Sequence, residues 1–334
     1  MAKRVTIIDV AEAAGVSRQT VSRAMNDAWG ISESTRRKVL EAADRLGYRP
    51  SRFARNLVTR EKTHALGVMV ASFGNPYYTD IAASLLAAAA ERGWQIMLTA
   101  GESGVEEALS LLAPQVDVIV GHFGIADERL RDVCGGLPVV RMESEVPHDA
   151  ERLPGFHSVG LDMQSGIQEA VKELRDRGAR RFGMVESGHF QRYFGTYEPS
   201  ARRRWYEEAV GEALSGVVIG DESISGGGRA FAELMERHPD TDAVLMFNDL
   251  MALGAVQSAH ALRIDVPGRV RIVGVDGLSL GEAVDPPLTS IALDRDELAR
   301  HVMDIVEILA GADFARIDPI ERSVPSRLLW RGSA

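Results

Sequence analysis

Short apolar runs and longer amphipathic stretches alternate along most of the chain. The short runs are rich in Val, Ile and Leu and predict buried strands, whereas the longer stretches have apolar residues every three or four positions and predict helices. We expect strands at 66–70, 95–99, 116–120, 139–142, 181–185, 243–247 and 270–275, and helices near 81–92, 164–177, 201–214, 229–237, 250–261 and 297–309. Strands that alternate with helices in this way predict parallel sheets covered by helices on both faces.

The first sixty residues follow a different pattern, in which every predicted element is a helix. A capping-box-like start at Thr6 opens a helix that ends at Gly15, because glycine takes a left-handed backbone at little steric cost. Ser17 then caps a second helix, and a third is predicted for residues 33–46. The apolar positions expected to close a small core are Ile7, Val10, Ala11, Ala14, Val21, Ala24, Met25, Val39, Leu40, Ala43 and Leu46. The tight turn between the first two helices indicates a helix-turn-helix.

The second helix carries side chains suited to reading DNA. In a helix-turn-helix, the N-terminal residues of the second helix meet base edges in the major groove. Arginine can bond a guanine through two hydrogen bonds, and glutamine an adenine. The candidate base contacts are Arg18, Gln19, Thr20 and Arg23, and the candidate phosphate contacts are Ser17, Ser22 and Asn26. An ordinary amphipathic helix pair has the same apolar spacing, so that alternative stays open at this point.

The charge of the chain favours the DNA-reading interpretation. Residues 1–62 carry 13 Lys and Arg against 7 Asp and Glu, a net charge of +6, while the remaining residues carry 25 against 41, a net charge of −16. A chain with an overall charge of −10 does not bind nucleic acid through bulk charge. A basic head on an acidic body is instead typical of a specific DNA-binding protein.

Residues 48–60 continue the basic head. Pro50 is acceptable in the first turn of a short helix, and the arginines that follow, Arg52 and Arg55 among them, would lie near phosphates. Leu57 is a large apolar residue in this otherwise polar segment. It either contacts a partner chain or wedges between base steps of the minor groove and bends the duplex.

Together these segments resemble the LacI/GalR family of bacterial transcription regulators. The resemblance rests on T-x-x-D-V-A-x-x-A-G-V-S-x-x-T-V-S-R from Thr6 to Arg23 and on Y-x-P-x-x-x-A-R-x-L from Tyr48 to Leu57. It implies an N-terminal all-α helix-turn-helix DNA-binding domain, followed by an α/β periplasmic-binding-protein-like effector domain of two parallel-sheet lobes. The implied domains are 1–49 for DNA binding, 50–62 for a hinge helix, and 63–334 for effector binding and dimerisation, with an N-lobe of about 63–161 plus 292–320 and a C-lobe of about 162–291 plus 321–334.

The resemblance also implies a homodimer on near-palindromic double-stranded operator DNA, with Leu57 as the minor-groove wedge. The implied DNA contacts are Thr6, Ser17, Arg18, Gln19, Thr20, Ser22, Arg23, Asn26, Tyr48, Arg52, Arg55 and Leu57. Members of the family respond to a small molecule between the lobes. We expect a repressor of carbohydrate-utilisation genes that the effector releases from its operator.

The positions that follow predicted strands carry chemistry suited to a sugar, and binding sites of open α/β sheets lie at such strand ends. The candidate effector contacts, matched to the family's, are Phe73, Tyr77, Tyr78, Glu143, Arg204, Asn248 and Asp276. Carboxylates and amides bond hydroxyl groups, and an aromatic ring stacks on the C–H face of a sugar. Two structural alternatives stay open: an ion pair between Arg204 and Asp276, and a core position for Tyr77 or Tyr78.

Other functions are weighed against the sugar-released repressor. A purine-responsive or co-repressor-dependent regulator, and a regulator that answers to a protein partner, use the same fold. Gly277-Leu-Ser279-Leu-Gly281 matches the G-x-S-x-G string of serine hydrolases, but the prolines of residues 286–287 leave little room for the helix that such a nucleophile needs. We therefore do not expect an enzyme, and neither a metal-ligand spacing nor a nucleotide-binding glycine motif predicts a cofactor.

Two further features concern the cleft and the compartment. Residues 187–199 are longer than expected and hold four aromatic residues, which predicts stacking platforms for an oligosaccharide or, alternatively, a self-packed surface loop. Cys134 is the single cysteine, which rules out an internal disulfide and suits a reducing compartment. The N-terminus lacks an apolar signal core, and the most apolar helix is too short to span a bilayer. We expect a cytoplasmic protein without a membrane partner.

Overall fold

The computed structural model of the protein describes residues 5–25, 29–48, 63–142, 155–188, 198–311 and 316–334. The chain divides into two compact units, Met1–Ala65 and Leu66–Ala334. This division falls three residues after the predicted end of the hinge, and the predicted hinge at 50–62 lies outside the described residues.

The first unit contains α1 (Ile7–Ala14), α2 (Arg18–Met25) and α3 (Glu33–Leu46). Thr6 caps α1 in a capping box with Asp9, and Gly15 ends it with φ 63°. The fully buried core is Val10, Ala11, Ala14, Val21, Ala24, Val39, Ala42 and Ala43. The prediction that Leu40 joins this core is wrong, because Leu40 is 45% exposed and the helical turn places Ala42 inside instead.

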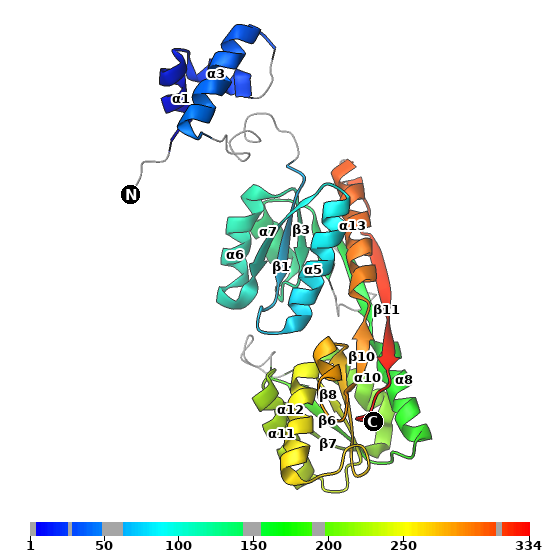
Figure 1. Ribbon diagram of the computed structural model, residues 1–334. Helices are drawn as coiled ribbons and strands as arrows, with labels where there is room; N and C mark the ends of the chain where they lie inside the picture. Colours follow the sequence, from blue (N-terminus) through cyan, green and yellow to red (C-terminus); the bar gives the residue numbers. More distant parts are fainter. Residues whose placement is uncertain (1–4, 26–28, 49–62, 143–154, 189–197, 312–315) are drawn as a thin grey trace. The chain divides into compact units, whose positions relative to one another are not determined.

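The second unit holds one continuous order of strands, β2-β1-β3-β4-β5-β11-β10-β9-β8-β6-β7. The first part comprises β1 (Ala65–Val70), β2 (Gln95–Ala100), β3 (Val118–Gly121), β4 (Val139–Met142) and β5 (Phe156–Asp162). Its helices are α5 (Pro76–Glu91), α6 (Val105–Leu112), α7 (Asp127–Cys134) and α13 (Arg295–Gly311). Helices α5 and α13 pack together, as do α6 and α7, and β1 and β3 lie between these pairs (Figure 1).

The second part has the same layered construction. Its strands are β6 (Phe182–Ser187), β7 (Leu214–Gly220), β8 (Ala243–Met246), β9 (Arg271–Asp276) and β10 (Thr289–Leu293). Its helices are α8 (Met163–Asp176), α10 (Ala201–Val210), α11 (Ile224–Arg237) and α12 (Asp249–Leu262). Helix α8 packs on α10, and α11 packs on α12. The pairs β6–β7, β6–β8, β8–β9 and β9–β10 are parallel, as the alternation of strands and helices predicts.

Strand β11 (Glu321–Leu329) joins the two parts. Glu321–Pro325 pair in parallel with β5, whereas Ser326–Leu329 pair antiparallel with β10. The strand therefore changes partners at Pro325, four residues after the lobe boundary predicted at 321. The chain also crosses from β5 into α8 and from β10 into α13, so three connections link the two lobes.

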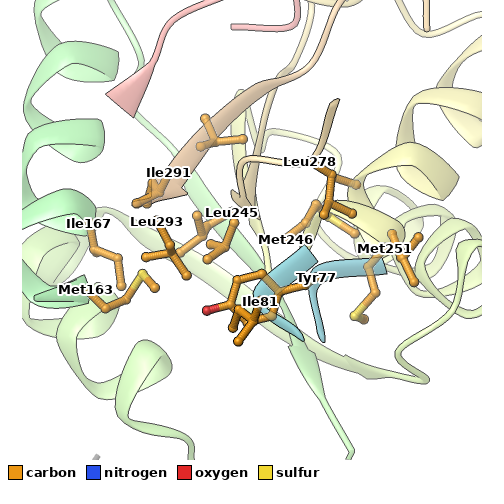
Figure 2. Packing of buried hydrophobic residues seen from close by; sticks show 14 of the residues in the cluster. Tyr77, Ile81, Met163, Ile167, Leu245, Met246, Met251, Leu278, Ile291 and Leu293 are labelled. Carbon is orange, nitrogen blue, oxygen red and sulfur yellow. The ribbon is translucent and has the colours of Figure 1, made fainter. Parts of the chain in front are cut away.

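Apolar residues from both lobes form one hydrophobic core cluster. Tyr77 and Ile81 of α5 belong to the same cluster as Leu293 of β10 and Met163 of α8 (Figure 2). The closest packing between helices occurs where glycines of α11 meet α12. A Cβ atom at Gly227 would overlap the backbone of Met251, and one at Gly254 would overlap the carbonyl oxygen of Ile224. The two helices can approach so closely only because Gly227 and Gly254 have no side chain.

Several elements differ from the predicted pattern. Strands β5, β7, β10 and β11 and helices α6 and α7 are absent from the predicted set, and α10 ends at Val210 instead of continuing to 214. None of the helices in the described part of the chain is both long and apolar enough to cross a membrane.

Candidate DNA-reading face and effector site

Helix α2 presents the predicted base contacts to solvent. Arg18, Gln19 and Arg23 are exposed, while Val21 and Ala24 of the same helix are buried in the core. The Ser17 hydroxyl accepts a hydrogen bond from the backbone N–H of Thr20 at 3.1 Å and bonds the Thr20 hydroxyl at 2.9 Å. The helix is thus capped at its start, and its outer face carries the donors and acceptors that base edges require.

The other predicted DNA contacts are placed as follows. Thr6 is exposed, and its hydroxyl donates to the Asp9 carboxylate at 2.7 Å as part of the capping box. Ser22 is half-buried on α2. Tyr48 is half-buried and packs against the three-helix core, which gives its ring a structural role in addition to any contact with DNA. Asn26, Arg52, Arg55 and Leu57 lie outside the described residues.

In the second unit, Asn248 and Asp249 follow β8 and start α12. Asn248 is the N-cap, its side-chain oxygen accepts a hydrogen bond from the Met251 N–H at 2.9 Å, and it is 2% exposed. Its side-chain nitrogen is buried and has no hydrogen-bond partner among the described residues. A buried amide donor without an acceptor costs about 1–3 kcal/mol, so an acceptor at this nitrogen would be stabilising.

Asp249 holds together three segments around the strand ends. Its carboxylate accepts hydrogen bonds from the Ser290 hydroxyl of β10 and from the Leu278 N–H after β9, both at 2.6 Å. The side chain is fully buried, and burial raises the pKa of Asp249 to about 6, although these hydrogen bonds and the charges of Arg295 and Arg331 oppose the shift. Asp249 therefore fixes the loop that follows β9.

Asp276 ends β9 in a strained backbone conformation. Its φ is 117°, in the region that side chains rarely adopt, and it is 1% exposed. Such strain persists only where the surroundings impose it, and it is concentrated at functional sites. Asp276 lies one strand away from Asn248, because β8 and β9 are neighbours.

Arg295, the first residue of α13, connects Asp276 to the other lobe. Its Nη2 donates to the backbone carbonyl of Asp276 at 2.7 Å, and its guanidinium lies 5.2 Å from the centre of the Tyr77 ring. The same nitrogen is 3.9 Å from the Asp80 carboxylate of α5. Sequence reasoning missed Arg295, and the available signal was its position just after the strand that crosses between the lobes.

The predicted aromatic contacts are divided between core and surface. Tyr77 is 2% exposed, so its ring is a core residue in this structure, beneath Arg295. Tyr78 is half-buried and meets the rings of Tyr77 and His122 edge-on, with ring centres 5.5 Å and 5.4 Å apart. Phe73 is 47% exposed, and its N–H donates to the Glu102 carboxylate at 3.0 Å. Tyr78 and Phe73 are thus the candidate rings that remain accessible.

Arg204 does not pair with Asp276 in the described contacts. Arg204 is exposed and donates to the carbonyl of Pro199 at 2.6 Å. Arg202, two residues earlier, donates to the Phe247 carbonyl at 2.7 Å and lies 4.5 Å from the centre of the Phe247 ring. Arg202 is therefore the arginine nearer to Asn248. Glu143 lies outside the described residues.

Carboxylates also lie at the end of β6 and just after β7: Glu186 is buried and Glu222 is half-buried. Glu186 is buried and accepts a hydrogen bond from the Ser200 hydroxyl at 2.9 Å, and burial raises its pKa. The Ser187 hydroxyl donates to Glu222. A surface cavity of about 390 Å³ lies beside them, with the ion pair of Asp221 and Arg229 on its wall. Residues 189–197 of the aromatic-rich loop lie outside the described residues.

Two alternative chemistries find no support in the described geometry. The G-x-S-x-G string continues into a 3-10 helix of four residues, Ser279–Glu282, instead of the helix that follows a hydrolase nucleophile. No group of three or more His, Cys, Asp and Glu side chains is placed to hold a metal ion in the described parts of the chain.

A helix-turn-helix head attached to two α/β lobes defines a DNA-binding transcription regulator. Residues 6–51 match the family model of bacterial regulatory proteins of the lacI family, and residues 171–334 match that of the periplasmic binding protein-like domain. The chain is 33% identical to the HTH-type transcriptional regulator CelR of Thermobifida fusca, over 99% of this chain and 98% of the relative. It is 31% identical to catabolite control protein A of Priestia megaterium, over 98% of this chain and 99% of the relative.

A solved structure is similar over the same length. It is a complex of the transcriptional regulator CelR with cellobiose, with a TM-score of 0.69 and 27% identity over 99% of this chain and 100% of that chain. The chain therefore belongs to the LacI family of bacterial regulatory proteins.

Proposed function

We propose that the protein represses genes for carbohydrate use and that a sugar bound between the two lobes releases it from its operator. The observation that carries this proposal is a polar cluster at the ends of three neighbouring parallel strands: Asn248 follows β8, Asp276 ends β9, and Arg295 follows β10 and donates to the Asp276 carbonyl. Carboxylate, amide and guanidinium groups together accept from and donate to hydroxyl groups. The cellobiose complex of the related CelR supports a sugar of this kind as the effector.

The exposed face of α2 supports sequence-specific operator binding. Arg18 and Gln19 are free of the helical core and can enter the major groove, while the capped start of α2 offers N–H groups to phosphate. We propose that Leu57 of the hinge enters the minor groove in the repressing state. We also propose that the protein is located in the cytoplasm, because that is where chromosomal operators lie.

A homodimer is proposed for the operator-bound form. One face of α5 exposes Leu86, at 56%, together with Ala83, Ala87 and Ala90, which recur at helical spacing. The adjoining β2 is the first strand of the sheet and exposes Leu98 at 43%. Exposed apolar side chains of this kind on neighbouring elements are suited to a second copy of the chain.

The polar cluster also favours a sugar over the purine alternative. A purine needs an accessible ring beside Arg204, but Arg204 donates to the Pro199 carbonyl, and of the two candidate tyrosines Tyr77 is buried and only Tyr78 is accessible. A purine effector or a co-repressor would appear directly in the experiment below.

The experiment is selection of genomic DNA fragments by the purified protein, with and without neutral mono- and disaccharides, adenine and guanine. We expect a near-palindromic motif beside sugar-transport and glycoside-hydrolase genes, enriched without ligand and lost with one sugar. Enrichment only in the presence of a ligand would instead establish a co-repressor, and fragments without a shared motif would refute operator recognition.

A further inference from the structure

We propose that Arg295 is a specificity-determining residue of the effector site, which donates hydrogen bonds to a sugar hydroxyl that Asp276 also binds, and that Tyr77 supports Arg295 instead of stacking on the sugar. This inference rests on the proposed sugar-binding function and assigns the donor that the sequence motifs did not identify.

The contacts of Arg295 orient its guanidinium without using all of its donors. One nitrogen is bonded to the Asp276 carbonyl at 2.7 Å and lies near Asp80 at 3.9 Å, and the Tyr77 ring supports the guanidinium from 5.2 Å. Guanidinium carries five N–H groups in a fixed plane. The Nε group is buried and has no hydrogen-bond partner among the described residues. The side chain is 17% exposed, so part of it faces outward.

The burial of Tyr77 excludes a stacking role for its ring in this structure. The ring is 2% exposed and packs in the core with Ile81 and Leu293 (Figure 2). A cation above an aromatic ring is attracted to the negative face of the ring, more strongly when the pair is desolvated. Tyr77 and Asp80, one helical turn apart on α5, thus hold the guanidinium over the end of β9.

The surrounding charges select a neutral polyol. Asp80 lies 3.9 Å from Arg295, and Asp276 accepts a hydrogen bond from Arg295 through its backbone carbonyl, so an anionic effector would meet like charge from these two residues. A hydroxyl group can donate to the Asp276 carboxylate and accept from Arg295 at the same time. A pair formed by a carboxylate and a guanidinium thereby discriminates a hydroxyl from a hydrogen atom at one position of the sugar ring.

The test uses the full-length protein with Arg295→Met, Arg295→Lys and, as the matched control, Arg300→Met, an exposed position on the same helix. Cellobiose, lactose and other neutral sugars are titrated calorimetrically into each variant, and thermal unfolding checks that each is folded. The sugar that binds is then compared with its monodeoxy analogues.

We expect Arg295→Met to weaken sugar binding at least about tenfold, Arg295→Lys less, and Arg300→Met less than about twofold. One deoxy analogue should lose affinity for the unmodified protein and lose less with Arg295→Met, because the guanidinium contact of that hydroxyl is already absent from the variant while the Asp276 contact remains. Unchanged or tighter binding by Arg295→Met, or equal analogue losses in both proteins, would overturn the assignment. If Arg295→Met does not fold, the analogue comparison with Arg295→Lys decides.

Failure of this inference is distinguishable from failure of the proposed function. If the unmodified protein binds none of the sugars, the sugar-binding function itself is refuted. If the unmodified protein and Arg295→Met bind one sugar with the same affinity, the sugar-binding function stands and only the role of Arg295 is refuted.

Discussion

The guanidinium of Arg295 donates to the backbone carbonyl of Asp276 across a distance of 2.7 Å. Arg295 begins the helix that packs on α5 of the first lobe, and Asp276 ends a strand of the second lobe. This single hydrogen bond therefore links the two lobes at a residue with a strained backbone.

Asp276 provides a test of that strain. We expect the free energy of unfolding of Asp276→Gly to exceed that of Asp276→Ala by about 1 kcal/mol or more, because glycine adopts a φ of 117° without a Cβ clash. Both variants remove the carboxylate, so both should lose sugar binding. Denaturant unfolding of the pair measures the difference, and equal stabilities would show that the backbone at Asp276 is not strained.

His157 predicts a pH-dependent contribution to stability. It is fully buried on β5, its Nδ1 accepts the Ile320 N–H at 3.1 Å, and burial lowers its pKa to about 4 from the usual 6.5. As the pH falls below 6.5, His157 binds a proton in the unfolded chain but not in the folded protein. The contribution of His157 to the free energy of unfolding is therefore complete above pH 6.5 and is lost toward pH 4. The loss is about 2 kcal/mol at pH 5.

The measurement has to isolate His157, because Asp249 acts in the opposite direction. With a pKa raised to about 6, Asp249 takes up its proton in the folded state first and gains stability as the pH falls. We therefore compare the protein with His157→Gln by urea unfolding at pH 7 and pH 5. The difference between their free energies of unfolding should fall by about 2 kcal/mol at pH 5, and a constant difference would contradict the burial of a neutral histidine.

The contact between α11 and α12 predicts a large loss of stability on adding one methyl group. Gly227→Ala should destabilise the second unit by about 3 kcal/mol or more, because the new Cβ would overlap the Met251 backbone, which cannot move without separating the helices. Gly311→Ala is the matched control, since nothing lies within 4 Å of a Cβ there. Thermal unfolding measures both, and similar midpoints for the two variants would disprove the close packing.

The apolar face of α5 predicts the effect of a charge at the proposed dimer surface. Leu86→Arg should convert the dimer to a monomer in analytical ultracentrifugation and weaken operator binding, because a desolvated charge is costly at an apolar interface. Leu262→Arg, at a site on α12 that is 51% exposed, should leave the mass unchanged. A dimeric Leu86→Arg would place the interface elsewhere.

The pattern of the sequence predicted the layered fold because most strands are continuous apolar runs. It did not predict β7, which contains two glycines and lies at the end of the sheet, or β11, which carries Pro325 where its pairing changes from β5 to β10. The helix-turn-helix was predicted almost to its boundaries, since caps such as Thr6 and Gly15 act locally.

Site prediction was more limited, because a motif gives position along the chain but not side-chain direction. Asn248 and Asp276 are neighbours through the pairing of β8 with β9, which the strand ends indicated. No local pattern revealed that Tyr77 would be buried beneath Arg295, or that Arg202 instead of Arg204 would approach Phe247. Those arrangements depend on contacts between segments distant in the sequence.

Operator release by the effector is tested most directly by titrating a fluorescent operator duplex, recovered by the genomic selection, with the full-length protein in the absence and presence of saturating sugar. We expect the sugar to weaken binding about 5- to 150-fold, as a coupling of about 1–3 kcal/mol between the two sites requires. Identical operator affinity with and without a sugar that is demonstrably bound would contradict the proposed repressor.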